Sequence, residues 1–161
     1  MEIRKATDED WPAIYEFYRD IMAEGFTYAF PTGQTLDEAR PWWMETEPGQ
    51  TVVATDGDDV LGSAKMGPNR PGRGSHIATA SFLVNPRCRN RGTGRRLGEY
   101  VIEWARAEGY HAIQFNAVVA SNHPAVHLWQ SLGFEIIGTV PEAFDHPVDG
   151  LVGLHVMYRR V

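Results

Sequence analysis

The chain has 161 residues, of which 43% are hydrophobic and 11% aromatic, and its net charge is −6. This length and composition suit one folded domain, residues 1–161, and exclude collagen-like, disordered and membrane-spanning chains. The acidic balance argues against a general nucleic-acid binder. The single cysteine, Cys88, excludes an internal disulfide framework and is typical of a reducing, cytoplasmic setting.

The first half of the chain predicts two helices and a hairpin. Thr7 to Asp10 offers capping and acidic side chains to a first helix, and Thr35 to Glu38 has the spacing of a capping box for a second, which is expected to end near Glu45. The apolar stripe of the first helix consists of Trp11, Ile14, Tyr15, Tyr18 and Met22. Strands are expected at 2–5, 50–55 and 60–65.

The second half alternates strands and helices. Strands are expected at 77–84, 112–118, 134–140 and 152–158, and helices at 92–108 and 124–132. Strand–helix–strand order requires parallel pairing, whereas the hairpin requires antiparallel pairing. The fold class predicted is therefore α/β, a single domain with a mixed sheet of six to seven strands and helices on both faces. The segments 25–33 and 140–152 are expected to be loops.

Five arginines fall within residues 87–96, around two glycines at the start of a predicted helix. Glycine weakens a helix, and cations at its N-terminus oppose the helix dipole, so the pattern gains little without a ligand. An anion explains both features, because glycines let backbone N–H groups approach it and arginines neutralise its charge. The alternative is a solvated, arginine-rich loop. The spacing matches neither a P-loop nor a dinucleotide-binding fingerprint.

The motif that remains is Arg-x-x-Gly-x-Gly at 89–94, followed by a second run of matches from Asn122 through Ala125, Leu128 and Trp129 to Leu132-Gly133-Phe134. Together they resemble the GCN5-related N-acetyltransferases, which bind acetyl-coenzyme A between two splayed parallel strands. The resemblance implies that these strands are 77–84 and 112–118. It implies acetyl-coenzyme A contacts at Phe82, Val84, Arg89, Arg91, Gly92, Thr93, Gly94, Arg95 and Asn122. Trp129 stands where many members have a proton-donating tyrosine, and an indole cannot supply that proton.

Residues 67–161 also resemble fungal acetyltransferases that act on azetidine-2-carboxylate and related proline-type amines. That resemblance implies catalytic roles for Asn116 and Asn122, with Thr79 at a third position that is asparagine in those enzymes. The side chains expected to contact the substrate are Tyr28, Arg73, His76, Thr79 and Asn116. Simpler alternatives are a hydrophobic plug for Tyr28, solvated side chains for Arg73 and His76, a buried amide satisfied by backbone for Asn116, and a helix cap for Asn122.

The sequence therefore predicts an N-acetyltransferase that moves an acetyl group from acetyl-coenzyme A to a small-molecule amine, such as an amino acid or proline-type analogue. The alternatives are a non-catalytic acyl-coenzyme A sensor and an enzyme acting on a protein N-terminus or lysine. His123 and His127 have the spacing of a helical zinc pair, but no third ligand is evident and no metal is expected. No membrane or nucleic-acid partner is expected, and the resemblance implies a homodimer.

Overall fold

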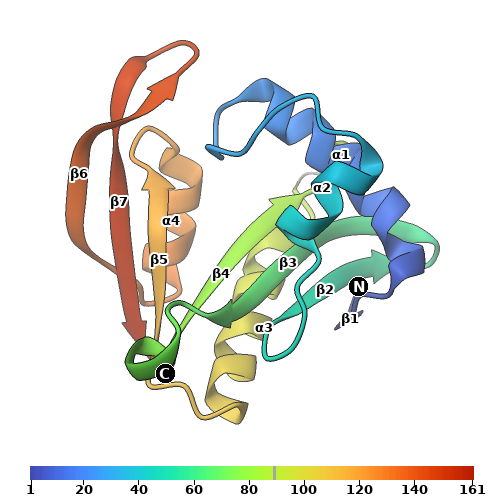
Figure 1. Ribbon diagram of the computed structural model, residues 1–161, viewed down its shortest axis with the longest axis horizontal. Coiled ribbons are helices and arrows are strands. Elements are labelled where there is room, and N and C mark those ends of the chain that lie inside the picture. The colour runs from blue at the N-terminus through green and yellow to red at the C-terminus, as the bar shows by residue number, and fades with distance from the viewer. Residues whose placement is uncertain (89) are drawn as a thin grey trace.

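The computed structural model describes residues 1–88 and 90–161 (Figure 1). Its strands form one sheet in the order β1-β2-β3-β4-β5-β7-β6. The strands are β1 (Glu2–Lys5), β2 (Gln50–Asp56), β3 (Asp59–Pro68), β4 (Ile77–Val84), β5 (Ala112–Val119), β6 (Glu135–His146) and β7 (Gly150–Arg160). The helices are α1 (Trp11–Glu24), α2 (Leu36–Trp43), α3 (Thr93–Ala107) and α4 (His123–Ser131).

The sheet is mixed, as predicted. Strands β4 and β5 pair in parallel, and α3 makes the crossover between them. Every other pair of neighbours is antiparallel, including the β2–β3 hairpin and the long β6–β7 hairpin. Parallel neighbours require a crossover and antiparallel neighbours do not, so the order of helices and strands along the chain explains this arrangement. The fold class predicted from the sequence is confirmed.

Helices cover both faces of the sheet and create two hydrophobic cores. The core under α1 and α2 includes Trp11, Ile14 and Trp43, and the core under α3 and α4 includes Leu97 and Val101. Strand β2 contributes side chains to both cores, because successive side chains of a strand point to opposite faces. Val52 packs toward α3, and Val53 packs toward α1 and α2.

Several boundaries differ from those predicted, and β3 runs to Pro68, three residues past its predicted end. Helix α2 ends at Trp43 instead of near Glu45, since the backbone of Met44 is extended after a helix that already contains Pro41. The segment 140–152 is not a loop, because β6 runs to His146, β7 begins at Gly150, and 147–149 form the turn. Nearly all of β6 is exposed, so its sequence lacks the apolar alternation that identifies a half-buried strand.

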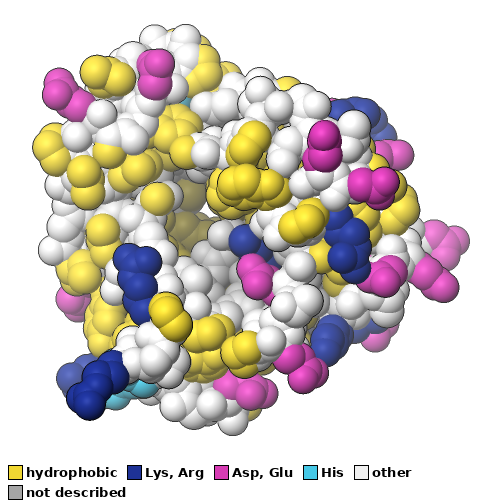
Figure 2. Space-filling view, viewed as in Figure 1, with side chains coloured by type: hydrophobic (Ala, Val, Ile, Leu, Met, Phe, Trp, Pro, Cys, Tyr) yellow, Lys and Arg dark blue, Asp and Glu magenta, His cyan; other side chains and the backbone are white. Residues whose placement is uncertain are grey.

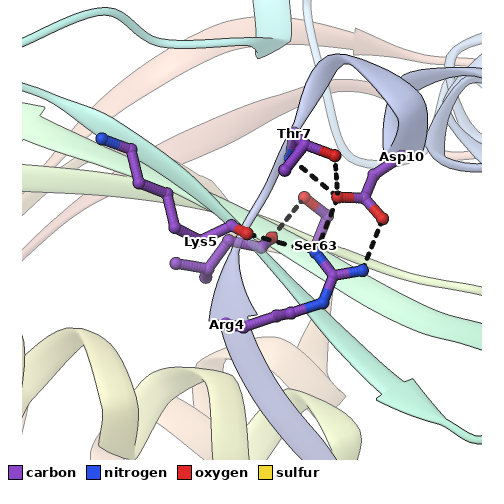
Figure 3. Close-up of polar contacts among 6 residues, drawn as sticks. Arg4, Lys5, Thr7, Asp10 and Ser63 are labelled. Carbon is purple, nitrogen blue, oxygen red and sulfur yellow. Dashed lines mark hydrogen bonds and ion pairs between the residues drawn. The ribbon is translucent and has the colours of Figure 1, made fainter.

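A buried carboxylate fastens the start of α1 to β1 (Figure 3). Arg4 donates from Nη1 and Nη2 to the two oxygens of Asp10, at 2.8 and 2.7 Å, and the backbone N–H of Thr7 donates to Asp10 at 2.7 Å. Arg4 and these hydrogen bonds lower the pKa of Asp10 to about 2. Within the part of the chain that the structure describes, no helix is long and apolar enough to cross a membrane.

Candidate active site

Strands β4 and β5 pair over only two residues and then separate. The paired positions are Ile77 with Ala112 and Ala78 with Ile113. Beyond them β4 continues to Val84, paired with its outer neighbour β3, and β5 continues to Val119, paired with its outer neighbour β7. Figure 1 shows the two strands diverging. In the space-filling view this face is hollowed between the α1–α2 side and the β6–β7 side (Figure 2). The predicted splay of the central parallel strands is therefore present.

The open edge of β4 is occupied at one residue by a phenol. Tyr28, in the connection between α1 and α2, accepts a hydrogen bond from the N–H of Phe82 at 2.8 Å and donates to the carbonyl oxygen of Phe82 at 2.7 Å. The N–H and carbonyl of Phe82 face the gap on the side of β4 away from β3. Backbone groups of alternate residues point to the same side of a strand. Those of Val84 face it as well. Burial raises the pKa of the Tyr28 phenol, which therefore stays protonated.

Aromatic rings fill the α4 side of the gap. The ring of Phe82 lies 4.5 Å from that of Trp129 and 5.6 Å from that of Phe115, which reaches Trp129 at 5.0 Å. Trp129 is only 7% exposed. It therefore belongs to a buried aromatic cluster that includes a ring from each of the two strands.

The start of α3 offers backbone donors beside the end of β4. Its cap, Gly92, has a φ of 71° and no side chain to bond the first turn. The N–H of Arg96 makes the first helical hydrogen bond, to the carbonyl of Gly92 at 3.1 Å, which leaves the N–H groups of Thr93, Gly94 and Arg95 without helical partners. The buried hydroxyl of Thr93 also has no hydrogen-bond partner among the described residues. Free donors and an unpartnered hydroxyl on one turn fit an anionic group such as a pyrophosphate.

Two arginines flank this helix start. Arg91 lies 3.4 Å from a carboxylate oxygen of Asp56, and Arg95 donates to Ser131 at 2.7 Å. Both side chains are about half exposed, at 49% and 47%. Exposed pairs of this kind contribute about 0–1 kcal/mol, so a phosphate can replace them at small cost. Arg89, the third arginine predicted at this position, lies outside the described residues.

The two asparagines predicted to be catalytic have different surroundings. The side chain of Asn122 caps α4 by accepting from the N–H of Ala125 at 3.3 Å, so the cap interpretation is confirmed. The prediction that Asn116 is buried is wrong, because its side chain is exposed where β5 has separated from β4. The Asn116 amide donates to Asn69 at 2.6 Å and accepts from Gln114 at 2.9 Å.

Sequence reasoning missed these two partners of Asn116. Gln114 is two residues before it and therefore on the same face of β5, which was a readable signal. Asn69 comes from the loop after β3, so its contact with Asn116 depends on the tertiary structure alone.

The other predicted substrate contacts lie near the paired end of β4 and β5, and only one of them lies in the gap. Thr79 is partly buried and follows the last β4 residue that pairs with β5, so it lies where the gap begins. Arg73 and His76 are exposed in the loop before β4, next to the paired end of the two strands. There the carbonyl of His76 accepts from the N–H of His111 at 2.9 Å. The structure thus brings Tyr28 and Thr79 to the gap but not Arg73 or His76.

His123 and His127 are exposed on α4. Across residues 1–88 and 90–161, no group of three or more histidine, cysteine or acidic side chains is placed to hold a metal ion.

The site thus consists of an opened pair of parallel strands beside a helix start with free N–H groups, and comparison with known proteins assigns its family. The profile of the acetyltransferase (GNAT) family matches residues 11–134. The chain belongs to this family, so the family, the fold and the N-acetyltransferase class predicted from the sequence are confirmed.

Individual relatives agree with this assignment. A solved GCN5-related N-acetyltransferase from Kribbella flavida is 55% identical, with a TM-score of 0.96 over 99% of this chain and 97% of that one. An L-methionine sulfoximine/L-methionine sulfone acetyltransferase from Pseudomonas aeruginosa is 36% identical, covering 87% of this chain and 83% of that protein. The N-acetyltransferase aca1 of Schizosaccharomyces pombe is 31% identical over 74% of this chain, which spans 64% of that protein's length.

Proposed function

We propose that this N-acetyltransferase transfers the acetyl group of acetyl-coenzyme A to the amine of a small molecule of the amino-acid class. One observation carries the choice of a small acceptor. The α1–α2 connection touches the tip of the β6–β7 hairpin, where Phe26 stacks on His146 with ring centres 5.2 Å apart and an angle of 23° between the planes. A Cβ on Gly25 would lie 3.3 Å from Pro147. These contacts close one end of the hollow to an extended peptide chain.

Acetyl-coenzyme A would supply an activated acetyl thioester. In this proposal the amides of Thr93, Gly94 and Arg95 bind its pyrophosphate, with charge supplied by Arg91 and Arg95. The open backbone groups of Val84 hold the pantetheine arm, and Phe82, Gly92 and Asn122 complete this side of the site. Arg89 belongs to the same predicted set but lies outside the described residues.

The acceptor would enter from the α1–α2 face. Gln114 and Asn69 fix the orientation of the Asn116 amide. One of its N–H bonds and one lone pair of its oxygen remain available to the amine substrate. Thr79 adds a hydroxyl at the start of the gap. The acetyltransferase from Pseudomonas aeruginosa is named for amino-acid substrates, which supports the same acceptor class. Arg73 and His76 lie beside the paired end of β4 and β5 and would contact a substrate only there.

The experiment is a competition among possible acceptors at equal concentration, with release of the coenzyme A thiol as the readout. The panel contains proline analogues, linear amino acids, polyamines, aminoglycosides and N-terminal peptides. The proposal expects the highest kcat/KM for an amino acid. A higher value for peptides or polyamines would refute the acceptor class. Tight binding of acetyl-coenzyme A without turnover of any acceptor would favour a sensor, which Trp129 at the tyrosine position permits.

We also place the protein in the cytoplasm as a homodimer of single-domain chains. The β6–β7 hairpin supports pairing, because β6 is an edge strand and the hairpin exposes Ile137, Val140 and Leu151 to 57%, 53% and 62%. Sedimentation equilibrium of the wild type and of Ile137→Lys tests this. A monomeric wild type would contradict it.

A further inference from the structure

Acetyl transfer from a thioester to an amine moves a proton from nitrogen to sulfur, and the residue that handles this proton is not evident from the sequence. Trp129 stands at the position of the usual tyrosine, and its indole does not release a proton near neutral pH. A phenol nevertheless reaches the same residue of β4, because Tyr28 bonds the backbone of Phe82 while Trp129 contacts its ring.

We propose that the Tyr28 hydroxyl is the catalytic proton donor to the departing thiolate sulfur, taking the role that Trp129 cannot fill. The inference rests on the proposed function, because it assumes that the thioester lies in the gap beside β4. It makes Tyr28 a group of the reacting centre and not only a wall of the acceptor pocket.

The phenol is held firmly enough to act in this way. Its oxygen makes two hydrogen bonds to one residue, the N–H and the carbonyl of Phe82, at the edge that β5 has left. Its ring is fixed by Phe30, 5.1 Å away, and by the buried Trp43, which it meets edge-on at 6.2 Å and 87°. A donor fixed before the substrate arrives loses little entropy during reaction.

The proton movements balance. The neutral amine forms the new C–N bond as the C–S bond breaks. The proton of Tyr28 Oη turns from the carbonyl of Phe82 to the sulfur, and Oη takes up the proton that the amine nitrogen loses. The products are an amide and a thiol, and the phenol is regenerated. Throughout, the N–H of Phe82 donates to Oη and stabilises the negative charge that develops there.

The test compares Tyr28→Phe with Tyr15→Phe. Tyr15 also donates its hydroxyl proton to a backbone carbonyl, that of Gln34 at 2.7 Å, so the control removes a comparable hydrogen bond from the same aromatic cluster. Because general acid catalysis contributes about 10²–10⁴-fold, kcat should fall at least about 10-fold in Tyr28→Phe and less than about 3-fold in Tyr15→Phe. Calorimetry should give dissociation constants for coenzyme A within about 3-fold of wild type for both variants.

A second readout separates proton donation from a structural role. With an acetyl thioester of a more acidic thiol, such as thiophenol, the leaving group needs less protonation, and the defect of Tyr28→Phe should shrink. An equal loss of kcat with acetyl-coenzyme A and with the thiophenol ester would overturn the proposal. An unchanged kcat in Tyr28→Phe would overturn the proposal too. If coenzyme A also bound this variant more tightly, Tyr28 would be a plug that the ligand displaces.

If Tyr28→Phe does not fold, 3-fluorotyrosine at position 28 keeps the ring and the hydroxyl while making the phenol more acidic. The change in kcat relative to wild type should then be larger with acetyl-coenzyme A than with the acetyl thioester of thiophenol, and equal changes with the two esters refute proton donation. If peptides are the preferred acceptors, the acceptor proposal fails. The ratio of kcat for Tyr28→Phe to kcat for wild type, measured on peptides, still decides the role of the phenol. A folded wild type that acetylates no acceptor would refute both.

Discussion

The substitution Gly94→Val tests the anion-binding role of the α3 start most directly. A Cβ on Gly94 would lie 3.3 Å from the Cδ2 of Leu128 on α4 and 3.6 Å from the Cγ2 of Val84 at the end of β4. The γ carbons of valine extend about 1.5 Å further, whereas apolar carbons prefer separations of about 3.5–4.0 Å. The first turn of α3 or these two side chains must therefore shift, and a shift of the turn moves its N–H groups.

The size of the effect follows from the donors on that turn. Crowding of a well-packed site costs about 1–3 kcal/mol of stability. Displacing even one of the N–H groups of 93–95 from a phosphate removes a charge-assisted hydrogen bond of about 1.5–3 kcal/mol. At about 1.4 kcal/mol per factor of ten, the dissociation constant of coenzyme A should rise about 10- to 150-fold.

Isothermal calorimetry with coenzyme A measures this change, and circular dichroism establishes that the variant is folded. Gly138→Val is the matched control, because no atom of the described residues, apart from the two chain neighbours, lies within 4 Å of a Cβ at Gly138 on β6. Its affinity should equal that of the wild type. A folded Gly94→Val protein with undiminished affinity would refute the placement of the pyrophosphate at the start of α3.

Three further predictions concern catalysis and stability. Trp129→Phe should retain most of the turnover while Asn116→Ala and Asn122→Ala lose more, as steady-state kinetics with the best acceptor will show; loss confined to Trp129→Phe, with coenzyme A affinity intact, would reverse that ranking. The pKa of Asp10 falls from 3.8 to about 2 on folding, so ionised Asp10 stabilises the folded state. This stabilisation is complete above about pH 4 and disappears as the pH falls through 2. Arg4 is 43% exposed and therefore screened, so this contribution to the free energy of unfolding is about 1–2 kcal/mol. In urea unfolding, Asp10→Asn should lose less free energy of unfolding between pH 7 and pH 3 than the wild type does. Equal losses would contradict this prediction. Ser63→Ala should cost about 1–3 kcal/mol in urea unfolding, because Ser63 links the indole of Trp43 to the carbonyl of Val52, whereas the exposed Ser75→Ala should cost less than about 0.5 kcal/mol.

Local patterns were sufficient to predict most elements of this fold. The predicted strand 77–84 has the bounds of β4, and the apolar stripe of the first helix supplies Trp11, Ile14, Tyr18 and Met22 to the core. These features depend on hydrophobic periodicity and on caps, which act between residues close together in the chain. The hairpin 135–160 was predicted too short because most of β6 is exposed and shows little periodicity.

The glycine–arginine segment, by itself, predicts an anion-binding site at a helix start, because spacing along the chain is enough to place backbone donors there. Only the tertiary structure decided what surrounds that site. Tyr28 meets Phe82 across 54 positions of sequence, and Asn116 meets Asn69 across 47. Such contacts depend on where β5 parts from β4 and on how the α1–α2 connection folds back over the sheet. Both are set by the packing of the whole molecule and not by any short pattern. The contacts of Tyr28 with Phe82 and of Asn116 with Asn69 could therefore be recognised only after the chain was folded, although Tyr28 and Asn116 themselves were predicted from the sequence.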